Sequence, residues 1–539
     1  MTHADTQSPK LAAALARELA RHLTDIVICP GSRNSALSLA LLARSDIRIH
    51  SRIDERSAAF LALGIARVTG RHVGVLTTSG TAVANCLPSC LEAQHSHTPL
   101  AIISADRPAE LVGTGANQTI EQRGLLRLDT VEITTEACVD KLVDAFTQPV
   151  VHINARFAEP LVAGMPQWEA SVPKVRVPKF AIDHGSVVVD LTKHTLVIAG
   201  DEAWRVDGLE DVPTIAEPTA PAPYHPVHPL AAGIFLREEI ARGEFVVHTK
   251  PEQIIVVGHP TLHRDVQALI ADPAIDVIVL SRTETIYNPA HREITVATRV
   301  TVQGVVSKQW LKITDSASQL AAAAVREILE DSSYGFTGLH VAAAIADTIE
   351  IGEAFFVGAS NPVRDASFVG FPIDAVETFS PRGTAGIDGN ISQATGVALA
   401  VQAREPDLLR APRTIALLGD VTFLHEVGGL LAPEVTVRPE NMTLVVANDH
   451  GGGIFETLEV GDKEYRKGFE QAFGTAHTVD LAAICQAYGH TYHRVESLTE
   501  LLEVLLETNT GEGVHIIEAV TTRETRREMH ADLRAKLAL

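Results

Sequence analysis

The chain has 539 residues, of which 46% are hydrophobic and 21% are charged, and its formal net charge is −22. This length predicts about three domains of ordinary size, and the composition is typical of a globular protein. The negative charge opposes non-specific nucleic-acid binding, and no apolar run reaches the roughly 20 residues needed to cross a bilayer. The start, MTHADTQSPK, lacks the pattern of a signal peptide, and the five cysteines are irregularly spaced. We therefore expect a cytoplasmic protein without nucleic-acid or membrane partners.

Strands and helices alternate along the first part of the chain. Ser8 and Pro9 are a good cap and first turn for a helix over 11–23. Further helices are predicted over 34–45, 55–70 and 82–97, and apolar strands over 25–31, 47–54, 72–78 and 99–106. This alternation predicts a parallel sheet covered by helices on both faces, with ligands bound outside the carboxyl ends of its strands. Polar residues gather at these ends, at 31–33, 54–55, 79–81 and 106–107.

Two further alternating regions follow. The middle region begins after the proline-spaced segment VPKVRVPKF (172–180), and strand and helix are expected in turn within 194–203, 252–270 and 275–284. The proline-rich segment 217–229 is expected to be a loop. The last region has predicted strands within 353–360, 375–383, 413–420, 442–449 and 514–521, and helices over 391–403, 479–489 and 498–509. Two regions of similar size thus flank a smaller one, which suggests an old duplication at the level of fold.

Several familiar signatures are absent or have simpler explanations. The chain has no G-x-x-x-x-G-K-[ST] loop and no G-x-G-x-x-G after its first strand. His425-Glu426 resembles the start of a zinc-protease helix but lacks the second histidine, so we expect a surface pair. Cys86 and Cys90 lie four residues apart without a second pair, so we interpret them as packing residues.

Two apolar runs end in acidic residues. LLGDVTF (417–423) contains Asp420, and VVANDHGGGIF (445–455) contains Asp449. About one strand-helix-strand unit separates them, so the sheet is expected to place the two carboxylates side by side. Mg²⁺ commonly takes one or two carboxylates together with phosphate and water, and the glycines at 451–453 allow backbone amides to approach a phosphate. The alternative is that each aspartate caps the helix after its strand.

These two segments resemble the cofactor motif of thiamine-diphosphate enzymes, in which GDG is followed after some 25 to 30 residues by a doubled Asn. Val421 and Asp449 depart from that pattern, but both departures keep an oxygen ligand set. The resemblance implies thiamine diphosphate with Mg²⁺ or Mn²⁺, and it implies Asp420, Asp449 and the carbonyl of Gly451 as metal ligands. The implied cofactor-binding residues are Glu55, Ile387, Gly419, Asp420, Asp449, Gly451, Gly452, Ile454 and Phe455.

Glu55 is the catalytic residue that the resemblance implies. In this family such a glutamate hydrogen-bonds the aminopyrimidine ring and favours the tautomer that takes the C2 proton of the thiazolium. A carboxyl group buried among Phe60, Leu61 and alanines would have a raised pKa. The alternative is a first-turn glutamate stabilised by the helix dipole. Ile387 resembles the apolar residue that bends the cofactor, with core packing as its alternative.

A set of arginine-containing motifs narrows the resemblance. CPGSRNSAL, SADRPAEL, GANQTIEQ, GHPTLHR, GASNPVR and SPRGTAGIDG together resemble the family of 2-succinyl-5-enolpyruvyl-6-hydroxy-3-cyclohexene-1-carboxylate synthases of menaquinone biosynthesis, in order and over essentially the whole chain. The resemblance implies a substrate site lined by Ser32, Arg33, Arg107, Asn117, Gln118, His263, Arg264, Ser360, Arg364 and Arg382. His263 stands where relatives carry Lys. Arginine pairs with carboxylates in a bidentate way, and so many arginines would attract dianions.

The resemblance implies a three-domain α/β thiamine-diphosphate fold of parallel sheets flanked by helices. Its pyrimidine-binding domain would span 1–184, its central domain 185–334 and its diphosphate-binding domain 335–539. The implied enzyme is a transferase of the transketolase or carboligase type. It would decarboxylate 2-oxoglutarate and add the succinyl-semialdehyde carbanion to isochorismate in a Stetter-like conjugate addition. Family members bind the cofactor between subunits, so a homodimer is the expected minimal unit, and a homotetramer is compatible with it.

Two alternatives stay open at this point. Another carboligase of the same cofactor class, similar to acetolactate synthase, would use small monoacids and would have no need for so many arginines. A non-catalytic family member kept for binding or regulation would be expected to lose Glu55 or an acidic metal ligand, and both kinds of residue are present.

Overall fold

A computed structural model of the protein describes residues 7–175, 180–242 and 245–538. Part of the expected linker 172–180 and the first six residues lie outside this description. The chain divides into two compact units. Unit 1 comprises residues 1–180, 381–412 and 422–442, and unit 2 comprises residues 181–380, 413–421 and 443–539. Each unit is described by itself, and the predicted domain boundaries at 184 and 334 remain predictions.

A six-stranded parallel sheet forms the centre of unit 1, in the order β2-β1-β3-β4-β6-β5. Its strands are β1 (Asp25–Ile28), β2 (Arg48–Ser51), β3 (Val73–Thr77), β4 (Leu100–Asp106), β5 (Thr130–Ile133) and β6 (Val150–Arg156). The helices α1 (Gln7–His22), α2 (Ser35–Leu42) and α6 (Lys141–Ala145) share one apolar core with it. The helix α3 (Glu55–Thr69) packs against β1 and β3. The predicted covered parallel sheet is confirmed.

Three local expectations for this region need correction or addition. Ser8 does not cap α1, because it lies inside the helix and its hydroxyl donates to Ala158 O at 2.6 Å. The single helix predicted over 82–97 is two helices, α4 (Thr81–Ala84) and α5 (Leu87–His95). Pro88 near the start of α5 explains the break, since it lacks an amide proton to continue the preceding helix. The buried Cys86 and Cys90 are packing residues, as predicted. Strands β5 and β6 were not predicted.

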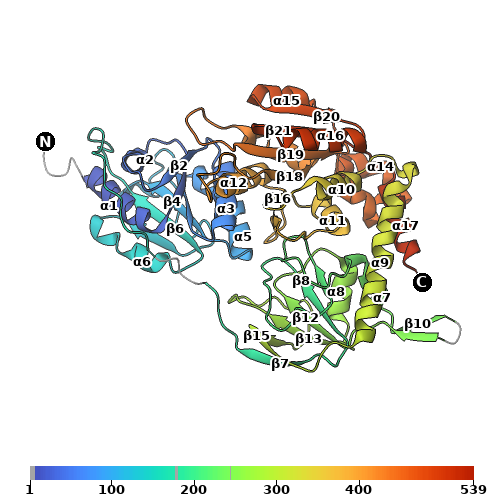
Figure 1. The fold of residues 1–539 in the computed structure, drawn as a ribbon. Coiled ribbons are helices and arrows are strands. Elements are labelled where there is room, and N and C mark those ends of the chain that lie inside the picture. The colour runs from blue at the N-terminus through green and yellow to red at the C-terminus, as the bar shows by residue number, and fades with distance from the viewer. Residues whose placement is uncertain (1–6, 176–179, 243–244, 539) are drawn as a thin grey trace. The chain divides into compact units, whose positions relative to one another are not determined.

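The middle region of the chain, in unit 2, forms a five-stranded parallel sheet in the order β14-β13-β12-β8-β9. Its strands are β8 (Thr195–Ala199), β9 (Thr214–Ala216), β12 (Gln253–Val257), β13 (Asp276–Leu280) and β14 (Thr295–Ala297). The helices α7 (Ala232–Phe235), α8 (Arg264–Ala271) and α9 (Lys308–Glu330) share its core. Strands β7 (Ser186–Asp190) and β15 (Arg299–Gln303) pair separately, and β10 (Glu239–Arg242) pairs with β11 (Phe245–His248) as a projecting hairpin (Figure 1).

A second six-stranded sheet has the order β17-β16-β18-β19-β21-β20. Its strands are β16 (Ala354–Val357), β17 (Glu377–Phe379), β18 (Thr414–Gly419), β19 (Asn441–Asn448), β20 (Thr491–Val495) and β21 (Gly513–Val520). The main helices of this region are α10 (Gly338–Thr348), α11 (Asn361–Phe368), α12 (Asn390–Gln402), α13 (Asp420–His425), α15 (Leu481–Tyr488), α16 (Leu498–Thr508) and α17 (Arg526–Lys536). In sequence order both six-stranded sheets read 2-1-3-4-6-5, which agrees with the suggested duplication.

Helices α3 and α12 cross closely within unit 1. A Cβ atom on Gly64 of α3 would clash with the carbonyl oxygen of Gln393, and one on Gly396 of α12 would clash with the carbonyl oxygen of Leu61. Only glycine permits this approach of the two backbones. The two helices occupy equivalent positions in their respective regions, since each connects the second strand of its six-stranded sheet to the third.

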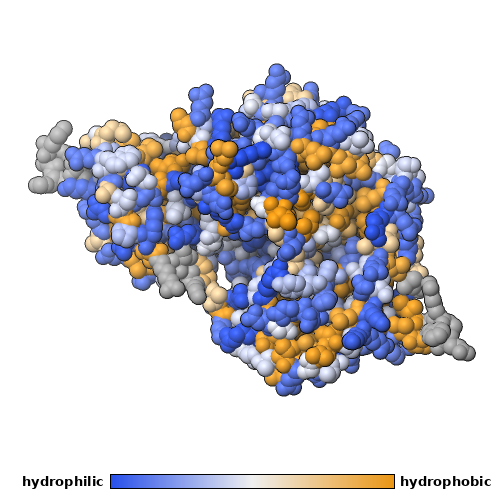
Figure 2. Space-filling view, viewed as in Figure 1, coloured by the Kyte–Doolittle hydropathy of each residue, from blue (hydrophilic) through white to orange (hydrophobic). Residues whose placement is uncertain are grey.

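The described residues contain no helix that is both long and apolar enough to span a membrane. On the face shown in Figure 2, hydrophilic residues cover most of the surface and hydrophobic patches interrupt them.

Candidate active site

Asp420 and Asp449 lie at the ends of two neighbouring strands in unit 2. β18 ends at Gly419, and Asp420 begins α13; β19 ends at Asn448, and Asp449 follows it. Because β18 and β19 are adjacent in the sheet, the two carboxylates come together as the sequence predicted. The capping alternative holds in part for Asp420, whose carboxylate accepts hydrogen bonds from the amides of Val421 and Gly451.

The pair is costly to ionise where it lies. Burial raises the pKa of Asp420 to about 7. Burial and the neighbouring charge of Asp420 raise the pKa of Asp449 to about 7. Asp449 Oδ1 is buried and has no hydrogen-bond partner, while His477 Nε2 lies 2.7 Å from Asp420 Oδ2. Two close carboxylates with an unpaired buried oxygen are an arrangement that a divalent cation would stabilise.

The remaining ligands of such a cation would not be acidic side chains. The described part of the chain has no group of three or more His, Cys, Asp or Glu residues placed to hold a metal ion. Mg²⁺ commonly binds through one or two carboxylates and completes its shell with phosphate oxygens and water. The donor set at Asp420 and Asp449 therefore fits a magnesium–diphosphate group better than a bare structural metal.

The glycines after Asp449 have a structural explanation. Side chains on Gly451 and Gly452 would clash with the backbone of Phe473 and Gly474, and one on Gly453 would clash with the Asp449 carboxylate. Gly451 N donates to Asp420, Gly452 N to Gly474 O at 2.7 Å, and Gly453 N to Gly451 O at 3.0 Å. All three amides are therefore engaged within the protein. Contact between these amides and a phosphate remains a prediction.

Ile454 and Phe455 follow in the short helix η7 (Gly453–Thr457), where both are half-buried. The Phe455 ring lies 5.6 Å from that of Phe473. Gly419 ends β18 with open space beside its α-carbon. Gly419, Ile454 and Phe455 are close in sequence to Asp420 or Asp449. The role of these three residues in cofactor binding stays a prediction.

Glu55 is the first residue of α3 in unit 1. Asp54 caps the helix, because its carboxylate accepts from Arg56 N at 2.9 Å and from Ser57 N at 3.2 Å. Glu55 is half-buried rather than buried, which corrects the expected environment. Glu55 is only half-buried because it is the first residue of α3, at the carboxyl edge of the sheet, and the buried part of the helix begins at Ser57. Asp54, and not Glu55, therefore accepts the hydrogen bonds that cap α3.

Ile387 lies three residues before α12, also in unit 1, and is half-buried. The chain there is held against α3. A Cβ atom on Gly389 (φ +61°) would clash with the ring of Phe60, and the guanidinium of Arg56 lies 3.8 Å from Asp388. Ile387 therefore projects from a tightly packed turn, and its contact with the cofactor stays a prediction.

Arg33 and Arg107 lie near each other at the carboxyl edge of the first sheet. Burial and the charge of Arg107 lower the pKa of Arg33. Arg33 donates to Phe157 O at 2.9 Å and lies 3.7 Å from the exposed Glu159. Arg107 donates to Ser79 Oγ at 2.6 Å and to Gln118 O at 2.7 Å. Two neighbouring guanidinium groups create a local attraction for anions.

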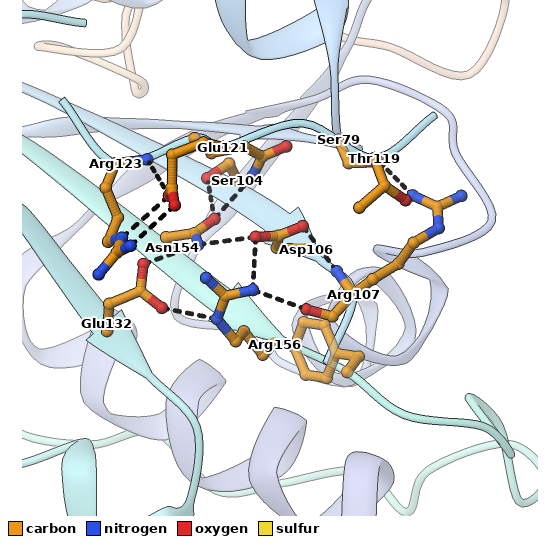
Figure 3. Close-up of polar contacts among 12 residues, drawn as sticks. Ser79, Ser104, Asp106, Arg107, Thr119, Glu121, Arg123, Glu132, Asn154 and Arg156 are labelled. Atoms are coloured by element: carbon orange, nitrogen blue, oxygen red, sulfur yellow. Dashed lines mark hydrogen bonds and ion pairs between the residues drawn. The ribbon is translucent and has the colours of Figure 1, made fainter. Parts of the chain in front are cut away.

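A polar network lies beside Arg107 and contacts its backbone (Figure 3). Asp106 accepts from Arg107 N at 2.7 Å, from Asn154 Nδ2 at 3.0 Å and from Arg156 at 2.9 Å. Arg156 also donates to Arg107 O at 2.9 Å and pairs with Glu132. The network spans the ends of β4, β5 and β6, so it fixes the backbone from which Arg107 projects.

The same network reaches the segment that carries Gln118. Asn154 Oδ1 accepts from Gln122 Nε2 at 2.7 Å, and Gln122 Oε1 accepts from Gly80 N at 2.8 Å. Gln118 Nε2 donates to Ser79 O at 3.0 Å. Arg107 and Gln118 are thus brought together as predicted, and both are partly accessible. Ser32 and Asn117 are exposed in the same unit.

Four further predicted substrate residues lie in unit 2. Ser360 precedes α11, and Arg364 within α11 donates to Ser360 O at 2.6 Å. His263 Nε2 lies 2.8 Å from Ser367 Oγ, and its ring stacks on Phe368, so His263 is joined to the same helix. Arg264 is exposed and lies 3.6 Å from Glu459. The structure therefore groups Ser360, Arg364 and His263 around α11.

Arg382 is buried in unit 1. The amides of the next two residues, Gly383 and Thr384, donate to Glu92 at 2.7 and 2.6 Å. This contact fixes the turn that carries Arg382. Arg382 therefore belongs to a different unit from Ser360 and Arg364, with which it was grouped.

Sequence reasoning missed two residues beside the predicted site. His477 contacts Asp420, yet it lies in a segment that resembles no motif. Glu426 was expected at the surface with His425, but it is 1% exposed. A signal was present for Glu426, because only His425 separates it from the apolar and motif-bearing run 417–424.

Comparison with known proteins agrees with this geometry. Residues 9–125 match the N-terminal TPP-binding domain of thiamine pyrophosphate enzymes, and residues 375–519 match the C-terminal TPP-binding domain. A 2-succinyl-5-enolpyruvyl-6-hydroxy-3-cyclohexene-1-carboxylate synthase of Corynebacterium diphtheriae is 59% identical over 97% of this chain and 99% of its own length. Similar proteins with the same name include those of Corynebacterium glutamicum, at 54% identity over 99% of both chains, and Rhodococcus opacus, at 40% identity over 98% and 99%.

The carboxylate pair and the half-buried Glu55 lie within or next to the two matched TPP-binding regions. The matched relatives cover nearly the whole chain. The chain therefore belongs to the family of 2-succinyl-5-enolpyruvyl-6-hydroxy-3-cyclohexene-1-carboxylate synthases, within the thiamine-diphosphate enzymes.

Proposed function

We propose that this chain is a transferase that decarboxylates 2-oxoglutarate and joins the remaining succinyl-semialdehyde unit to isochorismate by conjugate addition, in menaquinone biosynthesis. The names of its full-length relatives support this reaction. The observation that carries the cofactor part is the carboxylate pair of buried Asp420 and half-buried Asp449, with one buried oxygen of Asp449 unpaired.

Thiamine diphosphate and Mg²⁺ or Mn²⁺ would be held at the ends of β18 and β19. Asp420, Asp449 and the carbonyl of Gly451 would ligate the metal, and Gly419, Gly452, Ile454 and Phe455 would line the diphosphate end. When bound, the thiazolium supplies an electron sink that lets a 2-oxo acid lose CO2 and become a nucleophile. Ile387 would support the ring system from an apolar side.

Glu55 is the residue for proton movement. Its carboxyl group would hold and exchange a proton with the aminopyrimidine end of the cofactor. The support for this role is its position at the first turn of α3, where Asp54 already caps the helix and leaves Glu55 available. A catalytic acid or base must lie within hydrogen-bond reach of the atom that it serves, so this turn has to be rigid.

The cationic residues would bind the substrate carboxylates and orient the two reactants. Ser360, Arg364 and Arg382 are assigned to 2-oxoglutarate. Arg33, Arg107, Gln118, His263 and Arg264 are assigned to isochorismate, with Ser32 and Asn117 beside them. The charge of Arg107, which together with burial lowers the pKa of Arg33, supports an anion site in unit 1. His263 also contacts Ser367 of α11, the helix that carries Arg364, so it lies beside residues assigned to 2-oxoglutarate.

The same proposal includes the assembly and the domain plan. A homodimer is the expected active unit, and a tetramer is compatible with it. The expected domains are a pyrimidine-binding domain over 1–184, a central domain over 185–334 and a diphosphate-binding domain over 335–539.

A direct test is CO2 release from 2-oxoglutarate and from pyruvate with purified protein, thiamine diphosphate and Mg²⁺. We expect release from 2-oxoglutarate and a product with isochorismate. Preference for pyruvate would favour the alternative, a carboligase similar to acetolactate synthase. Absence of calorimetric heat with thiamine diphosphate and Mg²⁺ would reject the cofactor assignment itself.

Kinetics of two variants test the division of the arginines. Arg364→Ala is expected to raise the Michaelis constant for 2-oxoglutarate, and Arg33→Ala that for isochorismate, each by about tenfold or more, because each loses a charged hydrogen-bond donor. If both variants mainly raise the constant for the same substrate, the division is wrong.

A further inference from the structure

Glu426 is a buried carboxylate that belongs to no predicted site. It lies in unit 1 directly after α13. Its Oε2 accepts from Ser392 N at 3.0 Å, its Oε1 accepts from Ser57 Oγ at 2.9 Å, and the hydroxyl of Ser392 also donates to Oε1. A Cβ atom on Gly429 would lie 2.6 Å from Oε1. The carboxylate is therefore enclosed, and the two serines supply its hydrogen-bond donors.

These two serines occupy the same position in two helices. Ser57 is the third residue of α3 and lies two residues after Glu55, while Ser392 is the third residue of α12. The N-cap of α12 is Gly389, which has no side chain to satisfy the first amides of the helix. Glu426 supplies that acceptor through Ser392 N. A negative group at the start of two helices is also stabilised by their dipoles.

The same turn of α3 has a second attachment. Arg56 donates to the carbonyl of His425 at 3.0 Å, and its guanidinium lies 3.8 Å from Asp388. Arg56 and Ser57 thus bind the neighbouring residues His425 and Glu426 respectively. The first turn of α3 is attached at two points immediately after Glu55. Burial raises the pKa of Glu426, and its serine donors act against that rise.

We infer that Glu426 is a positioning residue that fixes Glu55 by joining the first turn of α3 to the start of α12. Glu426 does not touch substrate or cofactor in this assignment. Glu426 acts on Glu55 through Ser57, which lies in the same helical turn. The position of Glu55 matters because a shift of about 1 Å in a reacting group is enough to lower the rate by a large factor. The inference rests on the proposed function only for the role of Glu55 in proton exchange.

Two measurements test it on Glu426→Gln, Ser57→Ala and Ser392→Ala. The first is amide hydrogen exchange over residues 52–60 in protein free of cofactor, which we expect to be about tenfold faster in Glu426→Gln because charged hydrogen bonds to the turn are lost. The second is hydrogen–deuterium exchange at C2 of bound thiamine diphosphate, which we expect to slow by a similar factor. The dissociation constant of the cofactor is expected to stay within about threefold of wild type, since the carboxylate pair is unchanged.

Glu353→Gln is the matched control, because Glu353 is a buried glutamate in unit 2 that pairs with Arg413. It is expected to change neither measurement. The effects of Ser57→Ala and Glu426→Gln are expected to be less than additive when combined, since both substitutions act on the same contact between Ser57 and Glu426.

Unchanged exchange at residues 52–60 and at C2 in all three variants would overturn the inference. So would equal slowing at C2 in Glu353→Gln. If Glu426→Gln does not fold, Ser57→Ala decides, because Glu426 keeps its two bonds from Ser392. If the wild-type protein binds no thiamine diphosphate, the proposed function fails, while amide exchange still decides whether Glu426 holds the turn.

Discussion

At the scale of single residues, Ser360 has an unusual backbone. Its φ of 76° and ψ of −132° nearly equal those of Gly80, at 79° and −131°. An L-residue held in this region is strained by about 1 to 3 kcal/mol, and such strain gathers at functional sites. Arg364 donates to the Ser360 carbonyl, so the strained peptide also orients the arginine assigned to 2-oxoglutarate.

Ser360→Gly is therefore expected to raise the free energy of unfolding by about 1 to 3 kcal/mol, and to raise the Michaelis constant for 2-oxoglutarate. Chemical denaturation and steady-state kinetics measure the two effects. Ser307→Gly is the control, because Ser307 caps α9 with an extended backbone and an ordinary bond to Trp310 N; it should lose a few tenths of a kcal/mol. Lower stability in Ser360→Gly would contradict the strain.

At the scale of elements, the polar network beside Arg107 contains His152 on β6. Its Nε2 lies 2.9 Å from Ser104 Oγ, its Nδ1 lies 3.1 Å from Thr130 Oγ1, and burial lowers its pKa from 6.5 to about 4. The folded protein therefore binds this proton less readily than the unfolded chain. The stability that neutral His152 gives is present above pH 6.5 and is lost as the pH falls towards 4.

His152→Gln is expected to remove roughly 2 to 3 kcal/mol of the difference in unfolding free energy between pH 7.5 and pH 4.5. Urea unfolding at the two pH values measures it. His248→Gln, at an exposed histidine of β11, should leave the difference unchanged. Equal pH dependence in wild type and His152→Gln would show that the network does not exclude the proton.

The crossing of α3 and α12 gives a second prediction at this scale. Gly64→Ala would place a methyl group against the carbonyl of Gln393. We expect it to cost about 1 to 3 kcal/mol in the free energy of unfolding, more than the gain in helix propensity of about 1 kcal/mol. Gly468→Ala is the control, since the space beside Gly468 is open. A stability gain in Gly64→Ala would contradict the close crossing.

The sequence predicted elements better than their contacts. Apolar runs such as 73–77 and 414–418 are strands because burial on both faces leaves few polar positions. The short strand β5 lacks such a run. The segment that forms α9 has helical periodicity, but no helix was predicted for it. At the site, the Asp420–Asp449 pair followed from strand neighbourhood. The Glu426–Ser57–Ser392 contact did not, because the partners are 369 and 34 residues apart and no local pattern records it.

At the scale of the whole molecule, ligand binding should stabilise the fold by mass action. With thiamine diphosphate and Mg²⁺ at 100 times the dissociation constant, we expect about 2.7 kcal/mol of added stability and a higher melting temperature. EDTA should abolish the gain, because the carboxylate pair would again lack its cation. A gain from thiamine diphosphate that persists in EDTA would exclude the metal as its anchor.

The shared strand order of the two six-stranded sheets bears on how the chain evolved. The helix after the second strand of each sheet is α3 in one case and α12 in the other, and they meet at Gly64 and Gly396. A single ancestral half that dimerised through this helix would show the same contact about a twofold axis. Fusion of two such copies would preserve the glycine-to-glycine contact while one copy came to supply Glu55 and the other the paired aspartates.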